Sequence, residues 1–264
     1  AVRTLARDPL TVPERARACV VICHEWGNHK ASKLKYAEML HEKGCAALLF
    51  ELRNHGESGR DTHWGDMGRR YTDDLASVVA KAREDERVRH LPLIVLAFSF
   101  STFAAVHCVA RGDGESVDGL ILDSGPAYDE RDTTHRFLCS FSSQLFPRWM
   151  RGPVLFPFAL RIIEWLIHRF AHEGDWPPRP EHLKKPMLVI SGTADAVVPE
   201  SQLRNFIAHA ANAELHVVQN CPHLRAFKED GEHYRDWING FIERVIVDKF
   251  AGTNAAQAVA ASAP

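Results

Sequence analysis

The sequence has little that would hold a polyanion or cross a membrane. Its 32 lysines and arginines nearly balance 34 aspartates and glutamates, and a net charge of −2 gives no field to attract nucleic acid. No run approaches the roughly eighteen apolar residues that a spanning helix needs. The first twenty residues contain four arginines and no apolar core of a signal peptide. We therefore expect a cytoplasmic protein with no nucleic-acid partner and no membrane span.

Signals for cofactors and metals are equally scarce. The six cysteines form no C-x-x-C pair, and several lie within apolar runs, which predicts reduced, buried thiols. The chain has no glycine-rich phosphate loop, so we expect no nucleotide cofactor. His24 and His29 are five residues apart and His41 lies further on, but no acidic or cysteine partner stands at ligand spacing. We expect no metal.

Six short apolar runs rich in Val, Ile and Leu recur along the chain. They are almost unbroken by polar residues and are separated by stretches of helical period, such as 34–43 and 73–86, which is typical of parallel strands buried on both faces. The sequence thus predicts an α/β fold with a mostly parallel central sheet covered by helices on both faces. The predicted strands are residues 19–23, 45–52, 93–98, 120–122, 187–190 and 215–218.

The regular alternation stops between about residues 126 and 186. Eight large aromatic residues occur within residues 137–170, more than a surface connection needs, so this segment either packs tightly on the sheet or roofs an apolar cavity. We interpret residues 127–185 as an inserted helical cap. The core then consists of residues 1–126 and 186–250, and the alanine-rich residues 251–264 are predicted to form a flexible tail, either disordered or loosely helical.

Ser99 is the candidate nucleophile. Residues 97–101 read Ala-Phe-Ser-Phe-Ser, which is small-x-Ser-x-small, and they join a predicted strand directly to a helical stretch. A sharp turn of this kind holds a serine hydroxyl above the end of the sheet, and small flanking residues avoid collisions with neighbouring elements. Ala97 and Ser101 stand where the motif usually has glycine. Alone, a serine in an apolar strand is more often a core hydroxyl, so the motif needs support.

Support comes from an acid and a base that follow later strands. Asp195 lies in SGTADAVVP after strand 187–190, and His223 lies in QNCPHLRAF after strand 215–218. The chain order Ser, Asp, His is that of α/β-hydrolases. Asp123, at the end of strand 120–122, is a competing acid. We favour Asp195 because its Gly-x-x-Asp turn followed by proline matches the commoner arrangement.

On these residues the chain resembles the α/β-hydrolase superfamily over roughly residues 17–126 and 183–245. The stretch FELRNHGESG at 50–59 is similar to the superfamily's Asp-x-Arg-Gly-His-Gly-x-Ser loop, in which we give His55 a structural role. The loop His24-Glu25-Trp26-Gly27-Asn28 resembles that of the dienelactone hydrolase branch, where a glutamate touches a resting cysteine nucleophile. The resemblance implies that Glu25 lies near Ser99, although a purely structural role for Glu25 is equally open.

The resemblance also implies a mechanism. Backbone N–H groups of Trp26 and Phe100 would form the oxyanion hole. Ser99 would attack an acyl carbonyl, with His223 as base and Asp195 orienting the histidine. We expect a cofactor-free hydrolase acting on an ester, thioester or lactone of a small molecule with an apolar acyl part. An acyltransferase or cyclase would use the same residues, and a non-catalytic binding protein on this fold also stays open.

Overall fold

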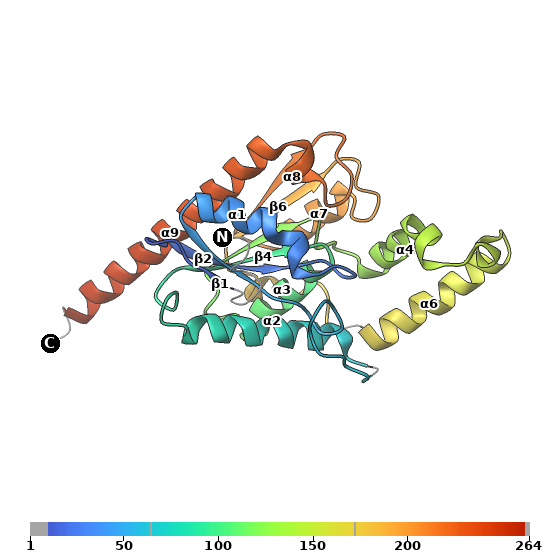
Figure 1. Cartoon of the computed structure of the whole chain (residues 1–264), viewed down its shortest axis with the longest axis horizontal. Helices are drawn as coiled ribbons and strands as arrows, with labels where there is room; N and C mark the ends of the chain where they lie inside the picture. Colours follow the sequence, from blue (N-terminus) through green and yellow to red (C-terminus); the bar gives the residue numbers. More distant parts are fainter. Residues whose placement is uncertain (1–9, 64, 172, 262–264) are drawn as a thin grey trace.

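The computed structural model describes residues 10–63, 65–171 and 173–261, and its centre is one seven-stranded sheet (Figure 1). The strand order is β1-β3-β2-β4-β5-β6-β7; β1 pairs antiparallel with β3, and every other pairing is parallel. This confirms the predicted α/β fold. The strands are β1 (Leu10–Thr11), β2 (Ala18–Cys23), β3 (Cys45–Leu49), β4 (Leu93–Phe98), β5 (Gly119–Asp123), β6 (Met187–Gly192) and β7 (Ala213–Val218).

Helices cover both faces of the sheet because the strand side chains alternate between two hydrophobic cores. In β2, Val21 points to one core and Val20 to the other. The first core is closed by α2 (Met67–Glu84), α3 (Phe100–Ala110) and α7 (Glu200–Ile207). The second is closed by α1 (Leu34–Glu42) and α9 (Gly231–Ala261), on the opposite face (Figure 1).

A helical insertion separates β5 from β6. It comprises α4 (Glu130–Ser140), α5 (Ser142–Leu145), a 3-10 turn η2 (Arg148–Arg151) and α6 (Leu155–Ala171). Its own small core contains Leu138, Phe146 and Leu160. Helices α4 and α6 project from the end of the molecule opposite the C-terminus (Figure 1). The remaining short helices are η1 (Lys30–Lys33), η3 (Pro180–His182) and α8 (Ala226–Glu229).

The sequence left the end of the chain open. We predicted a helix to about Phe250 and a disordered or loosely helical tail after it, and in the structure α9 continues to Ala261. Alanine is the strongest helix former, so an alanine-rich stretch readily extends a helix that is already packed on the sheet. Residues 1–9 of the predicted core and 262–264 of the predicted tail lie outside the described residues.

Two remaining expectations concerned the cysteines, which were predicted to be reduced and buried, and the absence of a membrane-spanning helix. All six thiols are free, and five of them are buried, Cys139 being partly exposed. Burial raises the pKa of Cys19, Cys23 and Cys108 to about 12, which keeps these thiols protonated. Among the helices that the structure describes, none has the length and hydrophobicity to cross a membrane.

Candidate active site

Ser99 occupies a sharp turn between β4 and α3. Its backbone has φ +49° and ψ −116°, a conformation that a non-glycine residue adopts only under strain. Its N–H donates to the Asp123 carbonyl at 2.8 Å, and its own carbonyl accepts from the Thr102 hydroxyl at 2.5 Å. These bonds hold the strained turn, so that the Ser99 hydroxyl stands at the carboxyl end of the parallel sheet.

The structure brings Ser99, His223 and Asp195 together from three separate strands. Ser99 Oγ lies 2.8 Å from His223 Nε2, and His223 Nδ1 lies 2.7 Å from Asp195 Oδ2. The second carboxylate oxygen of Asp195 accepts from the backbone N–H groups of Val197 and Val198, each at 2.9 Å. The Asp195 carboxylate is fully buried and the His223 side chain nearly so. A histidine held in this way can accept a proton from the serine hydroxyl.

The acid and base loops are clamped to each other. Ala194 N–H donates to the Cys221 carbonyl at 3.1 Å, and Asn220 N–H donates to the Thr193 hydroxyl at 2.8 Å. Gly192 makes this approach feasible, because a Cβ atom there would lie 2.0 Å from the Cys221 carbonyl oxygen. These contacts fix the positions of Asp195 and His223 relative to each other.

Asp123, the competing acid, has different partners. Its carboxylate is fully buried and accepts from the Tyr234 hydroxyl and the Ser124 hydroxyl, each at 2.8 Å. Burial raises the pKa of Asp123, although both hydrogen bonds oppose the rise. Ser124 Oγ also accepts from the Leu224 N–H at 3.0 Å, next to His223. Asp123 therefore supports the histidine loop through Ser124, while Asp195 contacts the imidazole itself.

The loop after β2, residues 24–28, lies beside the Ser99 turn. Ser101 is buried and its hydroxyl donates to the His24 carbonyl, which gives this residue a structural role, whereas Ser99 is only partly buried. Both ring nitrogens of His24 are engaged, with the Glu25 carbonyl at 2.8 Å and the Leu52 N–H at 3.2 Å. Burial lowers the pKa of His24. His24 is thus part of the framework of the loop.

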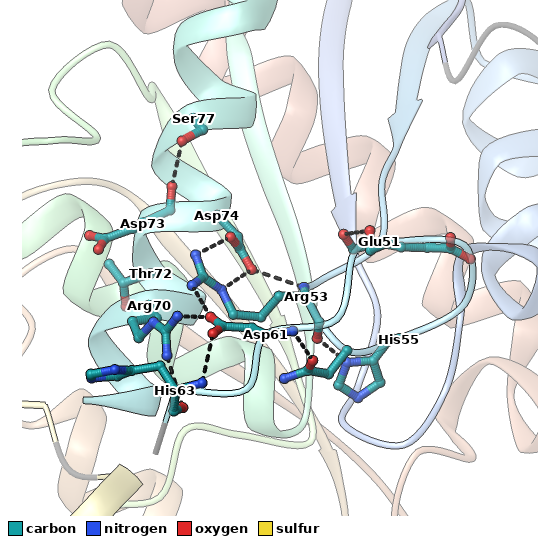
Figure 2. A network of polar contacts seen from close by, with 12 residues as sticks. Glu51, Arg53, His55, Asp61, His63, Arg70, Thr72, Asp73, Asp74 and Ser77 are labelled. Carbon is teal, nitrogen blue, oxygen red and sulfur yellow. Dashed lines mark hydrogen bonds and ion pairs between the residues drawn. The ribbon is translucent and has the colours of Figure 1, made fainter. Parts of the chain in front are cut away.

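A second histidine holds the same loop from the other side. His55 Nε2 accepts from the Gly27 N–H at 2.9 Å, and its Nδ1 donates to the Arg53 carbonyl at 2.8 Å. Figure 2 shows Arg53 between two carboxylates, those of Asp74 on α2 and of Asp61. The paired Arg53 fixes the backbone from which His55 reaches Gly27, in agreement with the structural role expected of His55.

Glu25 is bound within its own loop. Its carboxylate forms an ion pair with Lys33 Nζ at 2.5 Å and accepts from the Asn28 amide at 2.6 Å. Burial alone would raise the pKa of Glu25, but the charge and hydrogen bond of Lys33 outweigh it, and the pKa lies below its usual value. The Lys33 ammonium lies 3.9 Å from the centre of the Phe98 ring, immediately before Ser99. Sequence reasoning missed Lys33, since a lysine in a polar stretch is normally exposed.

Among the residues that the structure describes, the backbone N–H groups of Phe100, which follows Ser99, and of Trp26, in the loop beside the serine turn, have no protein acceptor. Phe100 is the first residue of α3, where an N–H has no partner within the helix. Within the described residues, no acceptor for the Trp26 N–H is present either. The resemblance to the α/β-hydrolase superfamily implied the same two N–H groups as oxyanion donors. Metal ligation has no comparable basis, because the described residues contain no cluster of three His, Cys, Asp or Glu side chains suited to an ion.

Comparison with known proteins identifies the family of this chain. A family model described as serine aminopeptidase, S33, matches residues 14–161, which is more than half of the chain. The chain belongs to this family. The fold of this S33 hydrolase is the α/β-hydrolase fold, in agreement with the superfamily resemblance found in the sequence.

Individual relatives of this S33 hydrolase are distant. An uncharacterized protein of Bacillus subtilis is 23% identical over 86% of this chain and 71% of its own length. A monoacylglycerol lipase of Mycolicibacterium smegmatis is 24% identical over 80% of this chain and 81% of its own. Among solved structures, an esterase of Pyrococcus furiosus aligns with a TM-score of 0.69 at 20% identity, covering 88% of this chain and 84% of the esterase. At that identity, the structural likeness shows the fold alone.

Proposed function

We propose that this S33 hydrolase is a serine esterase, with Ser99 as nucleophile, His223 as general base and Asp195 as the acid that orients the histidine. The observation that carries the proposal is the continuous row of hydrogen bonds from Ser99 through His223 to the buried Asp195. The esterase and the lipase among the similar proteins make an ester the first bond to test.

The reaction would proceed through an acyl-enzyme. As Ser99 Oγ bonds to the acyl carbon, its proton moves to His223 Nε2, and the imidazolium so formed is stabilised by Asp195. The protonated histidine then returns the proton to the leaving alkoxide, which departs as an alcohol. Water releases the acyl group by the same steps, and its proton again passes through His223. The negative charge on the former carbonyl oxygen would be bound by the N–H groups of Trp26 and Phe100.

The acyl part of the substrate would be apolar. Aromatic side chains surround the serine turn: the Tyr71 and Phe100 rings meet edge to face at 5.3 Å, and Trp26, about half exposed, meets Phe137 of α4 at 6.0 Å. Phe137 belongs to the helical insertion, residues 127–185 of our domain division, so the insertion would act as the cap over the acyl chain. An aromatic wall of this kind excludes water and favours hydrocarbon over polar groups.

A fluorophosphonate probe and a series of phenyl esters test the proposal. We expect the probe to label wild-type protein and the Ser101→Ala variant but not the Ser99→Ala variant, because only Ser99 is hydrogen-bonded to His223. Ser99→Ala and His223→Ala should each lower kcat by about 10⁴-fold or more. Labelling of Ser99→Ala, or full esterase activity in it, would refute the assignment.

Two further reactions at the same site are outcomes of this experiment. Because the family is described as a serine aminopeptidase, an alanine anilide should be offered beside the ester. Faster turnover of the anilide would replace the esterase assignment by a peptidase. An added alcohol or amine that captures the acyl group in preference to water would identify an acyltransferase. We expect hydrolysis of the ester to dominate, with longer straight acyl chains preferred to acetate.

A further inference from the structure

Helix α6 is apolar on two opposite faces. One face, with Leu160, Ile163 and Ile167, packs into the small core of the insertion. At 100° per residue, Phe158, Ile162 and Trp165 lie on the other face. That face is open to solvent: Phe158 is 68% exposed and Trp165 63% exposed.

This exposure is concentrated in one segment. Of the eleven large hydrophobic residues that are exposed in the described part of the chain, eight lie between residues 145 and 166. Trp149, 69% exposed, extends the surface beyond the start of α6. A helix that is apolar all round is normally covered, and a cluster of exposed aromatic side chains marks a contact surface. We call Trp149, Leu155, Phe158, Ile162 and Trp165 the apolar face of the insertion.

The charge around the apolar face is mainly positive. Residues 145–171 contain four arginines and a single acidic residue, in a chain whose net charge is −2. Arg148, Arg151 and Arg161 are exposed, and no ion pair joins them to an acidic residue in the part of the chain that the structure describes. The one carboxylate, that of Glu164, is paired with His135 at 2.7 Å. The arginine charge is therefore available to an anionic partner.

We propose that the apolar face docks on the surface of a membrane that contains anionic lipids. Tryptophan, phenylalanine and leucine on one side of a helix, with arginines beside them, fit a helix lying in the headgroup region, where arginine binds anionic lipid and the rings enter the acyl boundary. A second copy of this chain fits less well, because a two-fold contact uses the same patch on both copies and would bring two positively charged patches together. Lipid offers both the apolar and the anionic complement.

Docking in this orientation would bring the cap to the source of acyl lipids. Phe137 of α4, in the same insertion, contacts Trp26 beside the serine turn. A lipid leaving the bilayer at the insertion would thus meet the aromatic wall of the site first. This consequence rests on the proposed esterase function, whereas membrane docking itself does not.

Flotation with vesicles tests the docking. The full chain is mixed with vesicles of equal parts phosphatidylglycerol and phosphatidylcholine, or of phosphatidylcholine alone. We expect it to float with the anionic vesicles only, and to be released by salt, which screens the arginine charge. The double variant Trp149→Ser, Trp165→Ser should bind at least about tenfold more weakly because it buries less apolar surface. Arg148→Gln with Arg151→Gln should cost about 25-fold, from about fivefold for each arginine.

Matched variants elsewhere give the controls. Val247 and Phe250 are 63% and 50% exposed and belong to α9, the helix that runs to the end of the molecule opposite α6 (Figure 1). Replacing both by serine should therefore leave flotation unchanged. Ser99→Ala should also float normally, which separates docking from catalysis. The proposal is overturned if the wild type floats with neither vesicle, or if the tryptophan variant floats as well as wild type. A lipid-free dimer that dissociates in the tryptophan variant would assign the face to a second copy instead.

Discussion

The ion pair between Glu25 and Lys33 gives a sharp prediction for stability. The Lys33 side chain is 6% exposed and that of Glu25 15% exposed, and their charged atoms are 2.5 Å apart. We consider Glu25→Gln, which removes one charge and keeps the shape, Lys33→Met, which removes the other, and the double variant. Removing one partner of a buried pair leaves the other charge uncompensated, at a cost of about 3–5 kcal/mol.

The contacts of Lys33 narrow the expected loss of stability. In Glu25→Gln, the Lys33 ammonium keeps its contact with the Phe98 ring, so we expect a loss near the lower end, about 3 kcal/mol. The double variant leaves no buried charge and should lose about 1 kcal/mol, less than either single variant. Urea unfolding at neutral pH measures all three. Glu57→Gln is the matched control: Glu57 pairs with Lys30 at 2.8 Å but is 84% exposed, and its replacement should cost less than about 1 kcal/mol.

The pH dependence of this effect has a definite sign. The pKa of Glu25 is lowered in the folded chain, because Lys33 and the hydrogen bonds outweigh its burial. The carboxylate therefore contributes stability above the unfolded pKa of about 4.3, and this contribution disappears as the pH falls through the folded pKa. The difference between wild type and Glu25→Gln should shrink correspondingly in acid. If Glu25→Gln costs no more than Glu57→Gln at pH 7, or if the double variant is the least stable, the reasoning fails.

Two further predictions concern the site. Asp195→Asn should lower kcat by about 10⁴-fold with little change in urea stability, whereas Asp123→Asn should lower kcat by less than about tenfold. The reason is that, of the two carboxylates, Asp195 contacts the imidazole and Asp123 contacts Tyr234. The opposite order would make Asp123 the acid. Ser101→Gly removes the hydrogen bond to the His24 carbonyl and should lower kcat by about tenfold with KM unchanged. This loss is smaller than the 10²–10³-fold loss that follows removal of an oxyanion donor. A change confined to KM would contradict a role of Ser101 in holding the loop.

The sheet could be predicted from the sequence because its strands are buried on both faces. A strand such as β4 then consists almost entirely of apolar residues and stands out from its polar surroundings. Strand β1, with two residues, gives no such pattern and was not predicted. The end of α9 could not be predicted either, since an alanine-rich stretch has no hydrophobic periodicity to indicate where a helix ends.

In the site, too, some residues could be predicted from the sequence pattern and others could not. Ser99, Asp195 and His223 were predicted because each follows a strand, and parallel strands bring their carboxyl ends to one edge. The Glu25 partner was not predictable, since Lys33 comes from a 3-10 turn in a polar stretch. The dienelactone resemblance suggested a carboxylate directed at the nucleophile, whereas the Glu25 carboxylate binds Lys33 and Asn28. Its role is to hold the loop.

Glu25 and Ser101, two departures from the residues usual in the superfamily, both help to hold the same loop. Ser101 fixes the carbonyl of His24 and His55 fixes the N–H of Gly27, while Glu25 ties the loop through Lys33 to the Phe98 ring. The loop is thus held on both sides of Trp26, whose N–H has no acceptor among the described residues of the protein. A donor fixed before the substrate arrives needs no rearrangement when negative charge develops, which is what an oxyanion hole requires. These departures therefore favour a catalytic protein over a binding protein that has lost its chemistry.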